Sequence, residues 1–398
     1  MITVKEATNI VLENARDFGT EEVALEASVG RILKEPLIAD RDFPPFTRVS
    51  MDGIAIQYEV FEKGRRVFDI EGIQPAGAPP KALKHPENCL EVMTGAVLPD
   101  HTDTVIRYED VEISGGKARI LIEDIRAGQN AHRRASDRQK GDLLVRPNRL
   151  ISPAEIGVAA TVGKTTLKVA VRPRTVIIST GDELVDVRDT PLPHQIRRSN
   201  AHMLSAALRR DGISADHLHM NDDRSEIRDG LRKCLNSYDV LLMSGGVSKG
   251  KFDFIPEILE ELRVEKLFHK VRQRPGKPFW FGRSEGGALV FAFPGNPAST
   301  FMCATRYFRP WLRAGFGLAP FEEKYAVLEE DFEFAPALTY FLQAVVSCGN
   351  DGRLTARPVA GRGSGDLANL ADVDGFLELP ENQSRFEKGT AFRLCSFR

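Results

Sequence analysis

The segment Arg174-Thr-Val-Ile-Ile-Ser-Thr-Gly-Asp-Glu-Leu184 places a run of β-branched residues directly before a loop of small and acidic residues. Because Val, Ile and Thr favour extended backbone and residues 175–179 carry no charge, we interpret them as a buried strand. Residues 200–210 then show helical spacing, with Asn200 as the expected N-terminal cap and Gly212 as the stop. The fold class follows from this unit of strand, loop and helix.

The same alternation continues from this unit toward the C-terminus. We expect strands at 213–219, 240–243 and 288–293, and helices at 225–235 and 297–312. Strands that alternate with helices predict a doubly wound, mainly parallel α/β domain. Ligands of such domains bind beyond the carboxyl ends of the strands, so the loops at those ends are the first candidates for chemistry.

The segments on either side of this domain have different residue patterns. An amphipathic helix is expected near the N-terminus, and short strands, turns and prolines between residues 40 and 141 indicate a β-rich insertion. The segment 152–163 reads as a helix with Ser152 as its cap. Residues 314–398 alternate in polarity around a turn at 349–352, which suggests a small β-barrel or sandwich.

Composition excludes several classes of protein. The chain has 398 residues, 54 Lys and Arg, 56 Asp and Glu, and a net charge of -2, which argues against a general nucleic-acid binder. No apolar run approaches the roughly 18 residues that a membrane span needs, and the N-terminus lacks the pattern of a secretory signal. The five cysteines are scattered, which favours reduced thiols over a disulfide frame or a zinc site. We therefore expect a cytoplasmic protein that binds neither nucleic acid nor membrane.

Three glycine-containing loops follow predicted strands of the α/β domain: the first at 179–184, the second at 244–250 and the third at 293–299. Glycine lets backbone N–H groups approach an anion, and small hydroxyl residues add donors without bulk. Each loop alone could be a tight turn, but three at the strand ends of one domain favour a phosphate or oxyanion site. We expect the third loop to open a helix at Pro297, with Asn296 as its cap and its positive end toward the ligand. The candidate binding residues are Thr180, Gly181, Ser244, Gly245, Gly246, Ser248, Gly295, Asn296 and Pro297.

A basic segment lies between the second and third loops. Residues 270–278 contain four cations, of which Lys270, Arg274 and Lys277 are the candidates for binding an anion. A solvated surface loop is the plain alternative. The position of the segment between two anion-binding loops favours contact with ligand charge, through charge-assisted hydrogen bonds.

Carboxylates are also expected near these strand ends. Asp182, Glu183, Asp222 and Asp253 belong to the α/β domain, and each could simply face solvent. An anionic ligand beside several carboxylates calls for a bridging cation, so we predict that these four residues bind Mg²⁺.

These loops and several further motifs resemble those of the molybdopterin molybdenumtransferase family, which includes bacterial MoeA and the E domain of gephyrin. The further motifs are Pro44-Pro-Phe-Thr-Arg-Val-Ser-Met-Asp-Gly-Ile-Ala55, Met93-Thr-Gly-Ala-Val-Leu-Pro99, Arg274-Pro-Gly-Lys-Pro278 and Gly363-Ser-Gly365. The matches occur in the order typical of that family and cover almost the whole chain. A single motif would be weak, but the ordered set is specific.

The resemblance implies a subunit of four parts. These are a discontinuous helical linker domain (1–42 and 141–170), a β-rich inserted domain (43–140), an α/β pterin- and nucleotide-binding domain (171–313) and a C-terminal β-barrel (314–398). It also implies a homodimer whose active cleft lies between the α/β domain of one subunit and the inserted domain of the other. In that arrangement Asp52, Thr94 and Asp137 would act opposite Glu183, Asp222 and Asp253.

The activity that the resemblance implies is the insertion of molybdate into adenylylated molybdopterin with release of AMP. Thr94 would contact substrate, Ser364 would join the basic segment in orienting molybdate, and the catalytic candidates are Asp52, Asp137, Glu183, Asp222 and Asp253. An arginine common in the first strands of the family's C-terminal domain has no counterpart at residues 339–342. Two other functions stay open: adenylylation of the pterin, since the α/β loops alone do not separate the two activities, and a non-catalytic scaffold.

Overall fold

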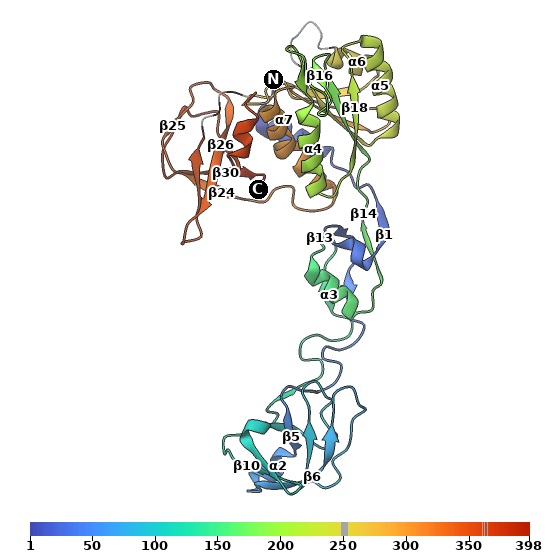
Figure 1. Ribbon diagram of the computed structural model, residues 1–398, viewed down its shortest axis with the longest axis vertical. Helices are drawn as coiled ribbons and strands as arrows, with labels where there is room; N and C mark the ends of the chain where they lie inside the picture. Colours follow the sequence, from blue (N-terminus) through green and yellow to red (C-terminus); the bar gives the residue numbers. More distant parts are fainter. Residues whose placement is uncertain (248–253, 360, 362, 364) are drawn as a thin grey trace.

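The computed structural model describes residues 1–247, 254–359, 361, 363 and 365–398, and it is elongated (Figure 1). The α/β domain and the C-terminal barrel lie side by side at one end, and the β-rich inserted domain lies at the other. A small linker domain joins them. No helix among the described residues is long and apolar enough to cross a membrane.

The α/β domain is built on a six-stranded sheet with the order β18-β15-β19-β23-β22-β20. Residues 175–180 of β15 are buried throughout, as their apolar sequence predicts, and β15 pairs in parallel with both β18 and β19. The strands are β15 (Thr175–Thr180), β18 (Ala215–Met220), β19 (Val240–Ser244), β20 (Glu265–His269), β22 (Trp280–Arg283) and β23 (Leu289–Phe293). The α/β class is confirmed, but the sequence did not predict β20 or β22, and β22 runs antiparallel to β23 and β20.

Helices pack on this sheet. They are α4 (Ser199–Arg210), α5 (Arg224–Ser237), α6 (Ile255–Glu261), α7 (Pro297–Cys303) and α8 (Arg309–Gly315), with one π-helical segment at Ala304–Phe308 between α7 and α8. The predicted helix 297–312 is therefore continuous but contains a π turn. The sheet residue Phe291 contacts Phe308 and Trp311 from this segment, with ring centroids 5.4 and 5.5 Å away.

The N-terminal helix α1 (Val4–Glu13) packs with the α/β domain rather than with the linker. Its buried residues Val4, Ala7 and Val11 join the same core as Phe291 and Trp311. The prediction that placed residues 1–42 in the linker domain therefore needs correction for this helix. Amphipathic spacing shows that a helix has an apolar face, but it does not show which domain covers that face.

The linker domain consists of the sheet β1-β14-β2-β13 and helix α3. Ser152 caps α3 (Pro153–Thr161) in a capping box with Glu155, which confirms the predicted start of this helix. The strands are β1 (Thr20–Ala24), β2 (Ile32–Leu33), β13 (Arg149–Leu150) and β14 (Thr166–Ala170), with β3 (Leu37–Ile38) paired to β12 (Leu143–Val145).

The inserted domain is a six-stranded sheet with the order β8-β5-β7-β6-β10-β9 and one short helix, α2 (Tyr58–Glu62). The strands are β5 (Gly53–Ile56), β6 (Val67–Gln74), β7 (Cys89–Val92), β8 (Thr104–Arg107), β9 (Val111–Ser114) and β10 (Lys117–Ile120), with β4 (Arg48–Val49) paired to β11 (Ala131–His132). The sheet covers its own apolar core, which includes Ile54, Phe68 and Ile106.

The C-terminal domain is a closed barrel rather than a sandwich. Its strands follow the order β26-β27-β24-β30-β28, and β26 also pairs with β28, which closes the ring. They are β24 (Tyr325–Leu328), β26 (Thr339–Cys348), β27 (Leu354–Pro358), β28 (Gly375–Leu379) and β30 (Ala391–Ser396), with β25 (Phe332–Glu333) paired to β29 (Arg385–Phe386). A further strand, β21 (Gln273–Arg274), comes from the basic segment of the α/β domain and pairs with β26. The barrel is thus joined to the α/β domain through that segment.

Candidate functional site

The first two glycine loops lie against each other at the carboxyl ends of β15 and β19. Gly245 and Gly246 have positive φ values of 105° and 70°, and a Cβ on Gly245 would lie 3.1 Å from the oxygen atoms of Thr180. The side-chain oxygen of Thr180 is buried and has no hydrogen-bond partner among the described residues. A buried hydroxyl without a partner is costly, so this position is suited to a ligand or a bound water.

Asn200 joins the second loop to the third. Its side-chain nitrogen donates to Ser244 Oγ at 2.8 Å and to the carbonyl of Gly295 at 2.7 Å. The prediction that Asn200 caps the helix at 200–210 is wrong, because α4 begins one residue earlier and Arg198 occupies the cap position without a side-chain cap bond. The amide therefore holds the site together, and its own Oδ1 is buried with no partner in the described part of the chain.

The third loop leads into the helical segment that begins at Pro297. Asn296 occupies the N-cap position as predicted, although its side chain makes no capping hydrogen bond. Gly295 lies close to the second loop, since a Cβ on it would be 3.7 Å from Gly245 Cα. All three predicted loops therefore meet at one edge of the sheet. Ser248 of the second loop lies outside the described residues.

The basic segment and the barrel form a cleft beside the third loop. The cleft has a volume of about 560 Å³, and Arg274, Lys277 and Asn296 are the sequence-predicted residues in its lining. Its other polar residues include Ser299, Tyr340 and Gln343, and its described lining contains no carboxylate. Two exposed cations in a cleft whose described lining has no acid favour an anionic ligand.

The backbone of the basic segment is held rigidly below these cations. Gln273 is buried and donates to the carbonyl of Gly276 at 3.1 Å, while it accepts a hydrogen bond from the Tyr307 hydroxyl. Gly276 has a φ of 88°, and a Cβ there would lie 2.6 Å from Cys303 Sγ, so only glycine fits. Lys270 lies at the start of the segment with a φ of 72°, and it is not part of the described cleft lining. Ser364 lies outside the described residues.

The predicted metal ligands are only partly brought together. Asp182 and Asp222 lie on adjacent loops, where the backbone N–H of Asp222 donates to Asp182 Oδ1 at 2.9 Å. The Glu183 side chain folds over the first loop, since a Cβ on Gly181 would lie 2.4 Å from Glu183 Oε2. Asp253 lies outside the described residues. Within the described ranges, no group of three or more His, Cys, Asp or Glu side chains could hold a metal ion by itself.

The candidate residues of the inserted domain form two small polar clusters. Asp52 accepts hydrogen bonds from the backbone N–H and the hydroxyl of Thr94, at 2.6 and 2.7 Å, and these bonds lower the pKa of Asp52. Asp137 pairs with His132 at 2.8 Å, which lowers the pKa of Asp137. Asp52 and Asp137 are therefore ionised at neutral pH. Their domain lies at the opposite end of the chain from the glycine loops, so one subunit does not unite the two sets (Figure 1).

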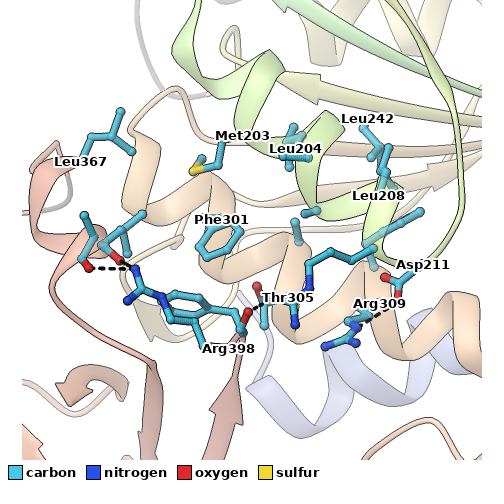
Figure 2. Close-up of a pocket in the computed structure, with 18 of the residues that line it drawn as sticks. Met203, Leu204, Leu208, Asp211, Leu242, Phe301, Thr305, Arg309, Leu367 and Arg398 are labelled. Atoms are coloured by element: carbon cyan, nitrogen blue, oxygen red, sulfur yellow. Dashed lines mark hydrogen bonds and ion pairs between the residues drawn. The ribbon is translucent and has the colours of Figure 1, made fainter. Parts of the chain in front are cut away.

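A second cavity, of about 570 Å³, differs in chemistry from the cleft. It lies between α4, the segment that follows α7 and the C-terminal residues, and Figure 2 shows Met203, Leu208 and Phe301 around it. Its charged side chains already have partners: Arg309 pairs with Asp211, and Arg398 donates to the carbonyl of Ala371. None of the sequence-predicted site residues lines this cavity, so it is not the candidate site.

Sequence reasoning missed three residues of the site. Asn200 gave a signal but was assigned the wrong role, as a helix cap. Tyr340 and Gln343 line the cleft from β26, but the sequence contains no signal for this role. Nothing distinguishes them from the other residues of a barrel strand until the barrel is placed beside the basic segment. Tyr340 stacks on Phe334 at 4.3 Å between ring centroids, and the Arg274 guanidinium lies 5.9 Å from the same Phe334 ring.

The fold and the site together define a class of protein. Three glycine loops at one sheet edge, two exposed cations and a closed barrel form a site suited to a phosphorylated or oxyanionic ligand, between two domains of a multidomain subunit. Three family profiles cover the chain in order: the MoeA N-terminal region (domain I and II) at residues 2–163, a probable molybdopterin binding domain at 176–314, and the MoeA C-terminal region (domain IV) at 325–397. The chain therefore belongs to the MoeA family.

Individual relatives agree with this assignment. A protein of Synechocystis sp. named molybdopterin molybdenumtransferase is 40% identical over 397 residues, which is 98% of this chain and 99% of the relative. A protein of the same name from Bacillus subtilis is 31% identical over 100% of this chain and 94% of its own length. A crystal structure of a molybdopterin biosynthesis MoeA protein from Pyrococcus horikoshii matches with a TM-score of 0.85 and 29% identity, covering 100% of this chain and 99% of that one.

Proposed function

We propose that this chain is a molybdopterin molybdenumtransferase that inserts molybdate into adenylylated molybdopterin and releases AMP. The name of its full-length relatives supports the reaction class. The observation that carries the proposal is the cleft lined by Arg274 and Lys277, which contains no described carboxylate and adjoins the third glycine loop. A cleft of this charge attracts both a pyrophosphate-linked pterin and the molybdate dianion.

Each part of the substrate has a counterpart in the site. The phosphates would lie on the glycine loops, where the buried Thr180 hydroxyl has no partner among the described residues and can donate to a phosphate oxygen. Molybdate would bind near Arg274 and Lys277, whose N–H groups donate charge-assisted hydrogen bonds to oxyanions. The same cations stabilise the negative charge that develops when the phosphoanhydride bond breaks and AMP leaves. No side chain need act as a covalent nucleophile.

We include Mg²⁺ in this proposal on the chemistry of the available donors. Asp182, Glu183 and Asp222 offer only oxygen atoms, which suit Mg²⁺, and they lie on adjacent loops. The substrate phosphates would supply further oxygen ligands, since Mg²⁺ is commonly held by one or two carboxylates together with phosphate groups. Bound there, Mg²⁺ would neutralise charge on the phosphate oxygens.

A homodimer belongs to the same proposal, because the polar clusters at Asp52 and Asp137 are distant from the glycine loops of their own subunit (Figure 1). A partner in the opposite orientation would bring its inserted domain to the cleft. We predict that the chain sediments at about twice its mass of 44.2 kDa at micromolar concentration. A monomer that retains full activity under those conditions would contradict the shared site.

The role of Asn200 leads to a second prediction. Asn200→Ala removes hydrogen bonds to two loops, each worth about 0.5–1.5 kcal/mol, so we expect adenylylated molybdopterin to bind roughly tenfold more weakly. Calorimetric titration would measure the change. Asn148→Ala, on the exposed surface of the linker domain, is the matched control and should bind normally. Equal affinity in both variants would reduce Asn200 to a structural residue.

One assay separates this function from its two rivals. The purified chain is incubated in two mixtures. The first contains ATP and unmodified molybdopterin, and the second contains adenylylated molybdopterin and molybdate. An insertase releases AMP only in the second mixture, and an adenylyltransferase consumes ATP only in the first. A scaffold is inactive in both.

A further inference from the structure

A small basic cavity lies on the junction of the α/β domain and the barrel, separate from the proposed active cleft. Its volume is about 60 Å³, and it shares no lining residue with the cleft. It lies between the segment that follows α7, the connection to the barrel and the end of β30. The charged residues of its lining are Arg306, Arg309, Arg313, Lys324, Arg393 and Glu322.

Arg306 is the most unusual of these residues. Its side chain is 3% exposed, and its Nε and Nη2 donate to Glu378 at 2.8 and 3.2 Å. The third nitrogen, Nη1, is buried and has no hydrogen-bond partner among the residues that the structure describes. The π-helical turn at Ala304–Phe308 presents this side chain, and such turns often occur at functional sites. A buried cationic donor without a partner calls for an acceptor that the protein itself does not supply.

A second cation lies close to Arg306 across one aromatic ring. The guanidinium carbons of Arg306 and Arg393 lie 4.9 and 4.0 Å from the centroid of the Phe321 ring. Cation–π contact offsets part of the repulsion between two such charges without using their N–H groups as donors. The ring thus holds two guanidinium groups beside one small cavity.

The acids around the cavity form only weak ion pairs with its cations. Glu322 is the only carboxylate of the described lining, and it is shared by Arg313 at 3.5 Å and Lys324 at 3.0 Å. Arg393 reaches Glu323 at 3.3 Å, and Glu323 is 66% exposed. Ion pairs this exposed contribute little, so the cations can turn toward a better acceptor.

We propose that this cavity binds a tetrahedral oxyanion of the phosphate or sulfate class. One water needs about 10–15 Å³ on the same measure, so a cavity of about 60 Å³ has room for one such ion but not for a nucleoside. Guanidinium groups match the geometry of these oxyanions, and Lys324 adds a further charge. The ion would accept a hydrogen bond from Arg306 Nη1.

Calorimetric titration of the full chain with inorganic phosphate, at ionic strength held constant with chloride, tests this site. We expect binding in the low millimolar range or tighter, and a loss of at least tenfold in the double variant Arg313→Gln with Lys324→Gln. Glu322→Gln should tighten binding severalfold, because it releases both cations from their shared acid. The opposite sign in Glu322→Gln keeps the test informative if the double variant folds poorly.

Two controls locate the ion. Arg385 lies in the same C-terminal domain, where it pairs with exposed Asp331, and the Arg385→Gln protein should bind phosphate normally. Lys277→Ala weakens any phosphate binding in the proposed active cleft, so the binding that remains in this variant belongs to the cavity, and a failure here is distinct from a failure of the proposed function. Sulfate should compete with phosphate, whereas AMP should not. Absence of binding, equal affinity in the double variant, or loss only in Lys277→Ala would overturn the proposal.

Discussion

Replacing Lys277 or Arg274 with alanine should raise the molybdate concentration for half-maximal insertion by roughly tenfold to a hundredfold. Each change removes one charge-assisted contact worth about 1.5–3 kcal/mol. The described lining of the cleft has only these two cations. Residues 339–342 of the neighbouring barrel strand contain no arginine, so this strand adds no cation to the pair. Binding of adenylylated molybdopterin should change less.

The effect of Lys277→Ala or Arg274→Ala on molybdate should also depend on salt. Arg274 and Lys277 are exposed, and charges in water are screened over about 10 Å at 0.1 M salt, so the difference from wild type should shrink as salt rises. Molybdate is titrated at two salt concentrations, with Lys388→Ala on the exposed barrel surface as the matched control. If half-saturation by molybdate is unchanged while pterin binding collapses, the basic segment binds the pterin phosphates instead.

The second large effect is expected at the acidic loops. Glu183→Gln and Asp253→Asn should each slow AMP release by tenfold or more, which corresponds to about 1.4 kcal/mol per factor of ten. Under the proposed function, each change removes a negatively charged oxygen ligand for Mg²⁺, so a higher Mg²⁺ concentration should restore part of the rate. The measurement is the initial rate of AMP release across a Mg²⁺ titration.

Two further variants serve as comparisons for AMP release by Glu183→Gln and Asp253→Asn. Glu257→Gln removes an exposed acid that pairs with Arg224, so it should turn over normally. Asp182→Asn changes the acceptor for the Asp222 backbone, so it tests loop geometry as well as charge. Unchanged turnover in both Glu183→Gln and Asp253→Asn would show that these acids only face solvent.

Much of the α/β domain could be predicted because its signals are local. The run of β-branched residues at 175–179 and the alternation that follows it are properties of short segments, and the structure forms the expected strands and loops there. The three glycine loops meet at one edge because parallel strands end on the same side of a sheet. The antiparallel strand β22 escaped notice, since Trp280-Phe-Gly-Arg283 has no alternation to distinguish it from the basic segment before it.

The parts that could not be predicted depend on contacts between distant segments. Asn200 looks like a helix cap in sequence, and only the fold brings Ser244 and Gly295 within reach of its amide. Tyr340 and Gln343 join the cleft because β21 pairs with β26, a contact between residues more than 60 positions apart. The contact between Asp52 and Thr94 has the same origin. Family resemblance supplied the expected roles of Asp52 and Thr94, and without it the sequence would have left Asp52 as a turn residue.

The most direct test of the central claim is molybdate-dependent release of AMP from adenylylated molybdopterin by the purified chain. The reaction is run with Mg²⁺, with and without molybdate, and both AMP and pterin-bound molybdenum are counted. We predict that AMP appears only when molybdate is present, in equal amount to the molybdenum incorporated, and that the combined Arg274→Ala and Lys277→Ala variant loses both. AMP release that ignores molybdate, or molybdenum incorporation without AMP, would contradict the account.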